Sequence, residues 1–301
     1  MSAEPTNRIT IALPVYNGDR FLAEALESVL KQTYPHWELV VYDNASTDGT
    51  EEIARDFAQR DPRIRYVRRK RNIGLARNFS AAFRPAQTEY FKWMAHDDIL
   101  APDMLERCLE ALERHPECVV AYPAAVAIDE NGTPDPDFDL GAEPDLSSPN
   151  AAERFRAYCG LPRPSVARYI FGLMRAEAVR STRLMRSHMW ADVTLLSELV
   201  LQGPFLAVPE TTNYLRVFPG HATALMAKQD LRAWQRVLDP RLATPIGTTI
   251  SRYRRYEEYF ASVARSDLPL GTKVKLFGFC ATLPVRRVPE VVSRQLAGVR
   301  R

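Results

Sequence analysis

Two carboxylates placed directly after an apolar run are the residues best suited to chemistry in this chain. Asp97 and Asp98 follow the apolar stretch 90–94. Their oxygens are hard ligands of the kind that Mg²⁺ and Mn²⁺ prefer, and such an ion neutralises charge that develops on a departing phosphate group. Adjacent side chains on a regular strand point to opposite faces, so both carboxylates reach one ion only if the chain turns there. Alone, an Asp-Asp pair is typical of a solvated helix N-terminus.

Two polar turn sequences lie upstream of this pair. Residues 14–18 read Pro-Val-Tyr-Asn-Gly, and residues 43–49 read Asp-Asn-Ala-Ser-Thr-Asp-Gly. A tyrosine ring can stack on a base, and a carboxylate can accept hydrogen bonds from ring or ribose donors. The two turns together therefore suit a nucleoside pocket, although Asn, Asp and Gly are equally typical of ordinary turns.

An alternation of strands and helices must position these turns. Apolar runs predict strands and apolar stripes predict helices, and Asp48 with Glu51 forms a candidate capping box for the second helix. Strands that alternate with helices indicate a mostly parallel sheet with helices on both faces and ligands beyond the carboxyl ends of the strands. The expected strands are 9–13, 37–42, 64–67 and 90–94, and the expected helices are 21–30, 48–59 and 74–83.

The pattern loosens after residue 112. Residues 131–150, rich in proline and acidic side chains, are typical of an exposed loop. Further elements are expected as a strand at 169–174, a helix at 192–202 and a strand at 205–208, and the chain beyond about residue 228 is helical, basic and rich in Tyr and Arg.

The bulk composition is that of a globular protein without a nucleic-acid signature. The chain has 40 Lys and Arg against 37 Asp and Glu, a formal charge of +3, which gives no ground for nucleic-acid binding. The four cysteines form no CxxC pair, so neither zinc nor a disulfide framework is expected. Without a signal-peptide pattern or a run of roughly 18 apolar residues, a cytoplasmic protein is expected.

One short segment has features of a membrane-surface contact. Residues 276–285 are mostly apolar and are flanked by Lys273, Lys275, Arg286 and Arg287. The segment is too short to span a bilayer. Within the region 270–290 it either lies on the inner face of an anionic membrane or packs on its own domain, and packing is the commoner outcome.

Four phrases in this order resemble the family 2 glycosyltransferases. They are IALPVYNG, QTYPHWELVVYDNASTDGT, the stretch 71–78 and MAHDD, and the similarity extends over residues 9–100 and more weakly to about residue 223. The resemblance implies an α/β GT-A (Rossmann-like) fold with a mixed sheet flanked by helices. The catalytic domain would span 1–225, with a nucleotide-binding half at about 1–100 and an acceptor-binding half at 101–225. A helical C-terminal extension would follow at 226–301.

The resemblance also implies roles for the residues at matching positions. Asp98 would bind Mn²⁺ or Mg²⁺, and Asp97 would bind ribose or assist the metal. The family's usual Asp-any-Asp pattern is incomplete, because the chain reads Ala95, His96, Asp97, Asp98 and the earlier Asp is absent. His96 is expected to be structural, with a second-choice role as a metal ligand. The residues expected to contact the nucleotide-sugar are Pro14, Tyr16, Asn17, Asp43, Asn44, Asn72, Arg77 and Asp97.

Three downstream residues complete the expected site. The family places a carboxylate before a helix of the acceptor half as the base that takes the acceptor's proton, and Asp192 fits that location. A simple N-cap is the alternative role for Asp192. Within the segment 214–223, His221 is expected to complete the metal shell, whereas Arg216, a planar cation with several donors, could instead bind phosphate.

The implied activity is inverting transfer of a sugar from a nucleotide-diphosphate sugar to an acceptor hydroxyl. UDP or TDP donors are favoured, and a carbohydrate or lipid-linked acceptor of cell-surface polysaccharide, glycolipid or glycoconjugate synthesis is expected. Three alternatives stay open: a non-catalytic nucleotide-sugar-binding protein of the same fold, a nucleotidyltransferase, and a membrane-binding module. A nucleotidyltransferase is expected to carry a Gly-rich first loop with Arg and Lys, which residues 14–19 lack.

Overall fold

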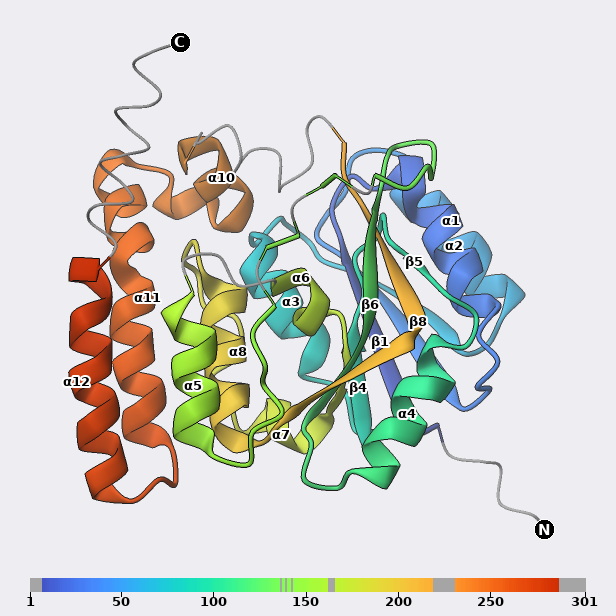
Figure 1. Cartoon of the computed structure of the whole chain (residues 1–301). Helices are drawn as coiled ribbons and strands as arrows, with labels where there is room; N and C mark the ends of the chain where they lie inside the picture. The colour runs from blue at the N-terminus through green and yellow to red at the C-terminus, as the bar shows by residue number, and fades with distance from the viewer. Residues whose placement is uncertain are drawn as a thin grey trace.

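A mixed eight-stranded sheet forms the centre of the computed structural model (Figure 1). The structure describes residues 7–135, 137–138, 140–141, 143–161, 166–218 and 231–286. The strand order is β3-β2-β1-β4-β7-β6-β8-β5. The strands are β1 (Ile9–Val15), β2 (Trp37–Asp43), β3 (Ile64–Arg68), β4 (Tyr90–Trp93), β5 (Ile99–Leu100), β6 (Val120–Ile128), β7 (Leu173–Arg175) and β8 (Phe205–Arg216).

The first four strands of the chain run parallel to one another. β1 lies between β2 and β4, and β3 pairs with the outer side of β2. Their carboxyl ends therefore meet at one edge, which is where ligands of open α/β sheets bind. β7 joins antiparallel to β4 and β6, and β5 joins antiparallel to β8, so the predicted mixed sheet is confirmed.

Helices cover both faces of the sheet because its strands are buried on both sides. All seven residues of β1 are buried, which explains its unbroken apolar run. One face carries α1 (Asp19–Leu30), α2 (Thr50–Arg60) and α4 (Met104–Arg114), and the other carries α3 (Leu75–Phe83), α5 (Ala151–Gly160) and α8 (Ala191–Gln202) (Figure 1). The short helices α6 (Val166–Ile170) and α7 (Ala176–Arg180) flank β7.

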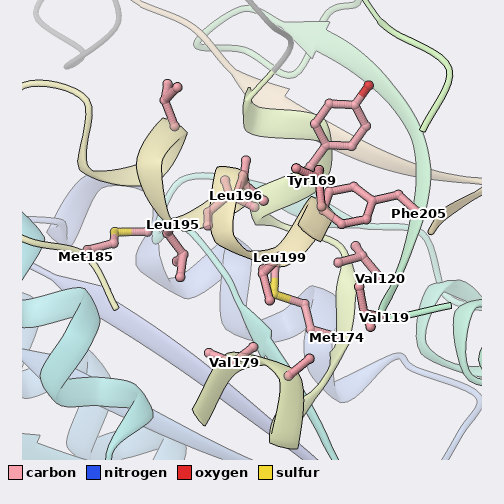
Figure 2. Packing of buried hydrophobic residues seen from close by; sticks show 14 of the residues in the cluster. Val119, Val120, Tyr169, Met174, Val179, Met185, Leu195, Leu196, Leu199 and Phe205 are labelled. Atoms are coloured by element: carbon pink, nitrogen blue, oxygen red, sulfur yellow. The ribbon is translucent and has the colours of Figure 1, made fainter. Parts of the chain in front are cut away.

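The C-terminal helices form a further layer outside α5 and α8. They are α10 (Leu231–Leu238), the turn η1 (Pro240–Leu242), α11 (Pro245–Arg265) and α12 (Leu270–Arg286). Tyr259 and Val263 of α11 and Leu276 of α12 are buried in the same hydrophobic cluster as Val120 and Phe205 of the sheet. Figure 2 shows part of this cluster, where Leu195 of α8 lies beside Met185 while Leu196 and Leu199 lie toward Phe205 and Met174. The C-terminal helices thus share a hydrophobic core with the sheet. The division of the chain into domains at 225/226 stays a prediction.

Three local expectations differ from the structure. Residues 166–170 are helical and the strand is confined to 173–175, because a short apolar run fits a buried helix turn as well as a strand. The helix expected to open at Asp48 begins at Thr50, whose backbone N–H donates to Asp48 Oδ1 at 3.1 Å. Glu51 is paired with Arg55 and Arg68 instead of closing a capping box.

Segment 276–285 lies inside α12, where its apolar side is used for packing. Leu276 and Cys280 are fully buried against the core, while Leu270 and Val274 near the start of the helix are exposed. No helix in the described ranges combines the length and the apolar character needed to cross a membrane. Membrane contact through 270–290 stays a prediction.

Candidate active site at the carboxyl edge of the sheet

The turns after β1 and β2 are tied together by the side chain of Asn17. Asn17 has a left-handed backbone with φ of 53°, and its Oδ1 accepts a hydrogen bond of 2.9 Å from the Thr47 backbone N–H. Its own N–H donates to Ser46 Oγ at 2.9 Å, and the N–H of Gly18 donates to Thr50 Oγ1 at 2.9 Å. Asn17 therefore shapes the edge of the site through both turns.

Asp43 lies beneath these turns as a fully enclosed carboxylate. Its Oδ1 accepts from the N–H of Ser46 at 2.8 Å and from Ser46 Oγ at 2.6 Å, and its Oδ2 accepts from Tyr66 Oη at 2.6 Å. Arg68 Nε lies 3.3 Å from the same Oδ2. Burial, followed by the hydrogen bond to Asp43, raises the pKa of Tyr66 above its ordinary value, so Tyr66 is a protonated donor. The Asp43 charge is thus fixed in place at the floor of the site.

Asn44 and Asn72 join the second turn to the third. Asn44 Nδ2 donates to Asn72 Oδ1 at 2.9 Å, and Asn44 Oδ1 accepts from the N–H of Ile73 at 2.9 Å. Asn72 Oδ1 also accepts from the N–H of Gly74 at 2.8 Å. Three successive strand ends are therefore held in one hydrogen-bonded frame, which reduces the conformational freedom lost when a ligand binds.

The remaining candidate nucleotide contacts differ in their accessibility. Pro14 is buried in β1 opposite Tyr42 of β2. Tyr16 follows β1 and is 45% exposed, which leaves a ring surface for stacking. Arg77 is exposed, and its Nε donates to Ser187 Oγ at 2.9 Å and lies 3.4 Å from Asp239 Oδ2. Arg77 thus extends from α3 toward the second half of the chain.

Asp97 and Asp98 lie in a turn after β4. The strand ends at Trp93, and β5 begins only at Ile99, so the alternating geometry of a strand does not separate the two carboxylates. Both residues are buried, with 2% and 4% exposure. Asp98 Oδ1 accepts from the N–H of Arg216 at 3.0 Å.

The Arg216 side chain holds this turn against three other elements. Its Nε donates to the carbonyl of Asp97, and its Nη1 donates to the carbonyls of Asp129 and Glu130, each at 3.0 Å. Its Nη2 lies 2.5 Å from Glu24 Oε2, and the guanidinium stacks 4.5 Å from the Phe21 ring centre. Because Arg216 is buried and these contacts occupy its donors, the phosphate-binding role considered for it is not supported.

His96 brings the carboxylate turn next to the first turn. A Cβ placed on Gly18 would lie 2.4 Å from His96 Cδ2, so the imidazole needs a glycine at that point. His96 Nδ1 lies 3.8 Å from Asp97 Oδ1. The Asp97–Asp98 turn and the Asn17 turn therefore occupy the same edge of the sheet.

The residues at this edge fit a divalent cation whose ligands come partly from protein carboxylates and partly from a phosphate of the substrate. Within the described part of the chain, no group of three or more His, Cys, Asp or Glu side chains is arranged to hold a metal by itself. Mg²⁺ is commonly held by one or two carboxylates together with substrate phosphates and water. The Asp97–Asp98 pair supplies that number of carboxylates. His221, the third expected ligand, lies outside the described residues.

Asp192 is the second residue of α8 and not its N-cap, a position held by Trp190. Its Oδ1 accepts from the N–H of Val193 at 2.8 Å. Burial raises the pKa of this carboxyl above its ordinary value, which makes it a stronger proton acceptor than a solvated aspartate. The nearby Tyr158 hydroxyl is buried and forms no hydrogen bond to any described residue.

The sequence did not indicate that three further residues hold the site residues in position. Tyr66, Arg68 and Arg216 orient Asp43 and the Asp97–Asp98 turn. The alternation of residue types within β3 is the sequence signal for Tyr66. In the structure Tyr66 is half-buried on this edge strand, and its hydroxyl reaches Asp43. Nothing local signals Arg216, which contacts Asp97 across more than one hundred residues of chain.

Residues 10–161 match the family model described as Glycosyl transferase family 2. Two relatives from Bacillus subtilis (strain 168) are EpsE, provisionally named as a glycosyltransferase, and TuaG, provisionally named as a teichuronic acid biosynthesis glycosyltransferase. EpsE is 32% identical over 59% of this chain and 63% of its own length. TuaG is 32% identical over 42% of this chain and 50% of its own length. The chain thus spans less than two thirds of the curated relatives it matches.

Two solved structures share the fold. Staphylococcus aureus TarS 1–349 in complex with UDP-GlcNAc has a TM-score of 0.66 at 15% identity, over 91% of this chain and 72% of TarS. The mannosyltransferase PcManGT from Pyrobaculum calidifontis, in complex with GDP-Man and Mn²⁺, has a TM-score of 0.53 at 17% identity, over 92% of this chain and 80% of its own. The expected GT-A architecture is confirmed.

Proposed function

The chain belongs to glycosyl transferase family 2, and from this premise we propose that it transfers a sugar from a nucleotide-diphosphate donor to a hydroxyl of a polysaccharide-type acceptor. The observation that carries the proposal is the meeting of the buried Asp97–Asp98 turn with the cross-linked turns after β1, β2 and β3 at one edge of the sheet. Names of relatives, including that of TuaG, support the polysaccharide class.

The donor nucleotide would lie over the hydrogen-bonded frame. Tyr16 offers an exposed ring to a base, and the fixed Asp43 and Asn44 define the floor on which base and ribose would rest. We favour a uridine or thymidine donor, in line with the UDP and UDP-GlcNAc bound to TarS. The GDP-Man bound to PcManGT makes guanosine donors the alternative to test.

Asp98, assisted by Asp97, would hold a divalent ion against the donor diphosphate. A bound Mn²⁺ or Mg²⁺ supplies Lewis-acid stabilisation of the negative charge on the leaving group. The protein keeps the two carboxylates in a buried turn through Arg216. The Arg216 side chain donates to the Asp97 carbonyl, and its backbone N–H donates to the Asp98 carboxylate. The Mn²⁺ present in PcManGT supports this assignment.

Asp192 would remove the acceptor's proton. In one displacement the acceptor oxygen forms a bond to the anomeric carbon, the bond from that carbon to the diphosphate oxygen breaks, and the hydroxyl proton passes to the Asp192 carboxylate. A single displacement inverts the anomeric configuration and needs no covalent enzyme intermediate. The raised pKa of Asp192 favours the proton transfer.

The donor and metal assignments are tested by thermal shift against UDP-, TDP- and GDP-sugars, each with Mn²⁺ and with EDTA. A ligand that binds only the native state at 100 times its Kd adds about 2.7 kcal/mol to the free energy of unfolding. We expect one nucleotide class to stabilise the protein in Mn²⁺ and not in EDTA.

The variant Asp98→Asn separates metal binding from folding. The amide keeps an oxygen for the Arg216 N–H but removes the charge that a cation requires, so donor stabilisation in Mn²⁺ should be lost. The exposed Asp56→Asn on α2 is the matched control and should behave as wild type. Equal donor stabilisation of Asp98→Asn and wild type in Mn²⁺ would falsify the metal assignment.

A further inference from the structure

Arginines gather around a hollow between α3, the segment 183–187 and the start of the C-terminal layer. The hollow has a volume of about 940 Å³ and is lined by seven arginines. We call it the basic trough, defined by Arg69, Arg77, Arg84, Arg186, Arg241 and Arg254, with Arg183 at its base. A second hollow of about 390 Å³ along residues 67–71 shares Arg69 and Ile73 with it and continues the basic surface.

Three carboxylates partly balance these arginines, and one of them, Asp239, itself lines the trough. Asp239 is 1% exposed and contacts Arg77 and Arg241, and Glu258 is 6% exposed and contacts Arg183, Arg186 and Arg254. Glu198 of α8 binds Arg183 at 2.9 Å. Seven arginines against these three described carboxylates leave an excess of four positive charges, whereas the whole chain carries only +3.

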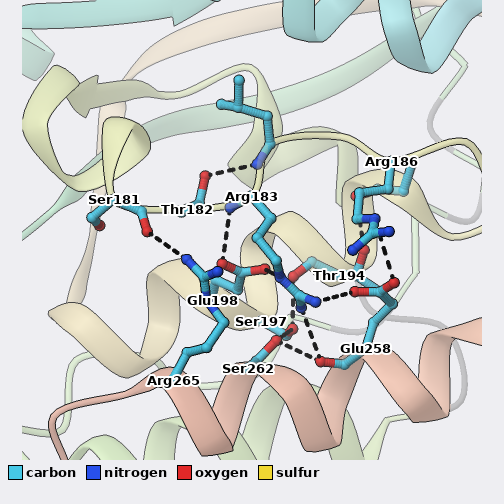
Figure 3. A network of polar contacts seen from close by, with 12 residues as sticks. Ser181, Thr182, Arg183, Arg186, Thr194, Ser197, Glu198, Glu258, Ser262 and Arg265 are labelled. Atoms are coloured by element: carbon cyan, nitrogen blue, oxygen red, sulfur yellow. Dashed lines mark hydrogen bonds and ion pairs between the residues drawn. The ribbon is translucent and has the colours of Figure 1, made fainter.

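Two carboxylates hold the Arg183 side chain at the base of the trough. Figure 3 shows Arg183 between Glu198 of α8 and Glu258 of α11, with Thr194, Ser197 and Ser262 beside them. Arg183 Nη1 lies 2.8 Å from Glu258 Oε2, and the backbone N–H of Arg183 donates to Glu198 Oε2 at 3.1 Å. The Arg183 guanidinium is therefore oriented before any ligand binds, which lowers the entropic cost of binding.

Other arginines of the trough keep free donors. Arg84 is exposed and has no hydrogen bond or ion pair with any residue that the structure describes. Arg186 is 43% exposed and reaches Glu258 only at 3.7 Å. A guanidinium presents several N–H donors in a planar fork that matches the two oxygens of a carboxylate or phosphate. The trough therefore suits a ligand that carries several such anions.

The position of the trough connects it with the acceptor. Arg77, on α3 directly after the third turn, forms one wall, and segment 183–187 forms another before the chain continues into α8 and Asp192. We propose that the basic trough binds an anionic acceptor, a glycan chain bearing phosphate or carboxylate groups. The assignment of this ligand as the acceptor rests on the proposed function. A hollow of about 940 Å³ lined from several segments fits part of a glycan chain better than the flat surface of a bilayer.

The binding test uses the whole protein without donor. Linear inorganic polyphosphate and polygalacturonate are the phosphate and carboxylate probes, and neutral dextran is the uncharged probe. We expect the wild type to bind both anionic probes and not dextran, with affinity that falls as salt rises. Arg84→Gln with Arg186→Gln should weaken anionic binding about twofold to thirtyfold, since each of the two exposed ion pairs contributes about 0.2–1 kcal/mol.

The matched control removes two arginines elsewhere. Arg107 and Arg114 on α4 are exposed and form ordinary helix-surface pairs, so Arg107→Gln with Arg114→Gln changes the net charge equally. Equal weakening in both double variants would mean that only net charge matters and would overturn the proposal. Binding to phosphatidylglycerol vesicles but to neither soluble probe would also overturn it, in favour of a membrane surface that includes the exposed Ile246 and Ile250.

Donor binding separates this proposal from the proposed function. The Arg84/Arg186 double variant should keep the metal-dependent thermal shift with the nucleotide-sugar, because neither residue belongs to the turns at the sheet edge. Anionic-probe binding without any donor effect would reject the proposed function and leave the trough intact. A donor effect without probe binding would reject the trough alone.

Discussion

A lysine is buried at the centre of the sheet. Lys92 on β4 is fully buried, and its Nζ donates to the carbonyl of Phe171. Burial lowers the pKa of Lys92 from 10.5 to about 8. Between pH 8 and 10.5 the unfolded chain therefore binds more protons than the native state, so the contribution of Lys92 to the free energy of unfolding rises with pH across this window.

The variant Lys92→Met tests the cost of this buried charge. Below pH 8 the variant should be more stable than wild type by on the order of 3–4 kcal/mol, because the pKa of Lys92 falls from 10.5 to about 8 and each pKa unit corresponds to about 1.4 kcal/mol. The difference should narrow as the pH rises from 8 to 10.5, as measured by urea unfolding. The exposed Lys31→Met serves as control. A difference that does not change with pH would show that folding does not lower the pKa of Lys92.

A second prediction at this scale concerns Asp192. Asp192→Asn preserves the acceptor for the Val193 N–H but cannot take a proton, so turnover should fall by about 100- to 10,000-fold, the usual scale for a general base. Donor binding should be unchanged by thermal shift. Because burial raises the Asp192 pKa, wild-type turnover should decline as the pH falls through that raised value. Near-normal turnover in the variant would assign Asp192 to helix α8 alone.

At the scale of elements, Arg216 joins β8 to the turn that carries the two carboxylates. Arg216→Gln removes donors from the buried carbonyl of Asp97 and from the partly buried carbonyls of Asp129 and Glu130. It should lower the free energy of unfolding by about 1–3 kcal/mol, the cost of leaving a buried group unsatisfied. The metal-dependent donor affinity should fall as well. Glu24→Gln, which changes only the exposed end of the contact, is the control. Lower stability with unaltered donor affinity would contradict a positioning role for Arg216.

The elements best predicted from sequence are those buried on both sides. β1 and β2 have continuous apolar runs because helices cover both faces, and polar residues appear abruptly where each strand ends. β7 was misplaced because it has only three residues and follows a helical turn of the same apolar character. A segment of three residues is too short for its pattern to distinguish a strand from a helical turn.

The site was predictable where chemistry follows a strand end and not where it depends on distant contacts. Asp43 is the last residue of β2, Asn44 follows it, and Asp98 lies in the turn after β4, so the topology brings all three to one edge. The basic trough combines α3 with residues 183–187 and 239–254, and no local pattern reports that these segments meet. The net charge of the whole chain, only +3, gives no indication of this local excess of arginines.

For the whole molecule, the C-terminal layer and the sheet should unfold together. Leu276 of α12 is fully buried in the cluster that includes the sheet strands. Leu276→Ala should lower the free energy of unfolding by about 2–5 kcal/mol and shift one cooperative transition, followed by both near- and far-UV circular dichroism. Leu270→Ala, at an exposed position of the same helix, should change it by less than about 0.5 kcal/mol. Two separate transitions would indicate independent units.

The same shared core affects how the chain folds during synthesis. α5 packs against α12, yet about 110 residues separate the end of α5 from the start of α12. At roughly 5–20 residues per second, a ribosome needs on the order of 5–20 s to produce the intervening chain. During that interval the part of the α5 surface that α12 covers faces solvent or a chaperone, although α8 already packs on α5. Pausing of translation near residue 270 would prolong that state and with it the risk of aggregation.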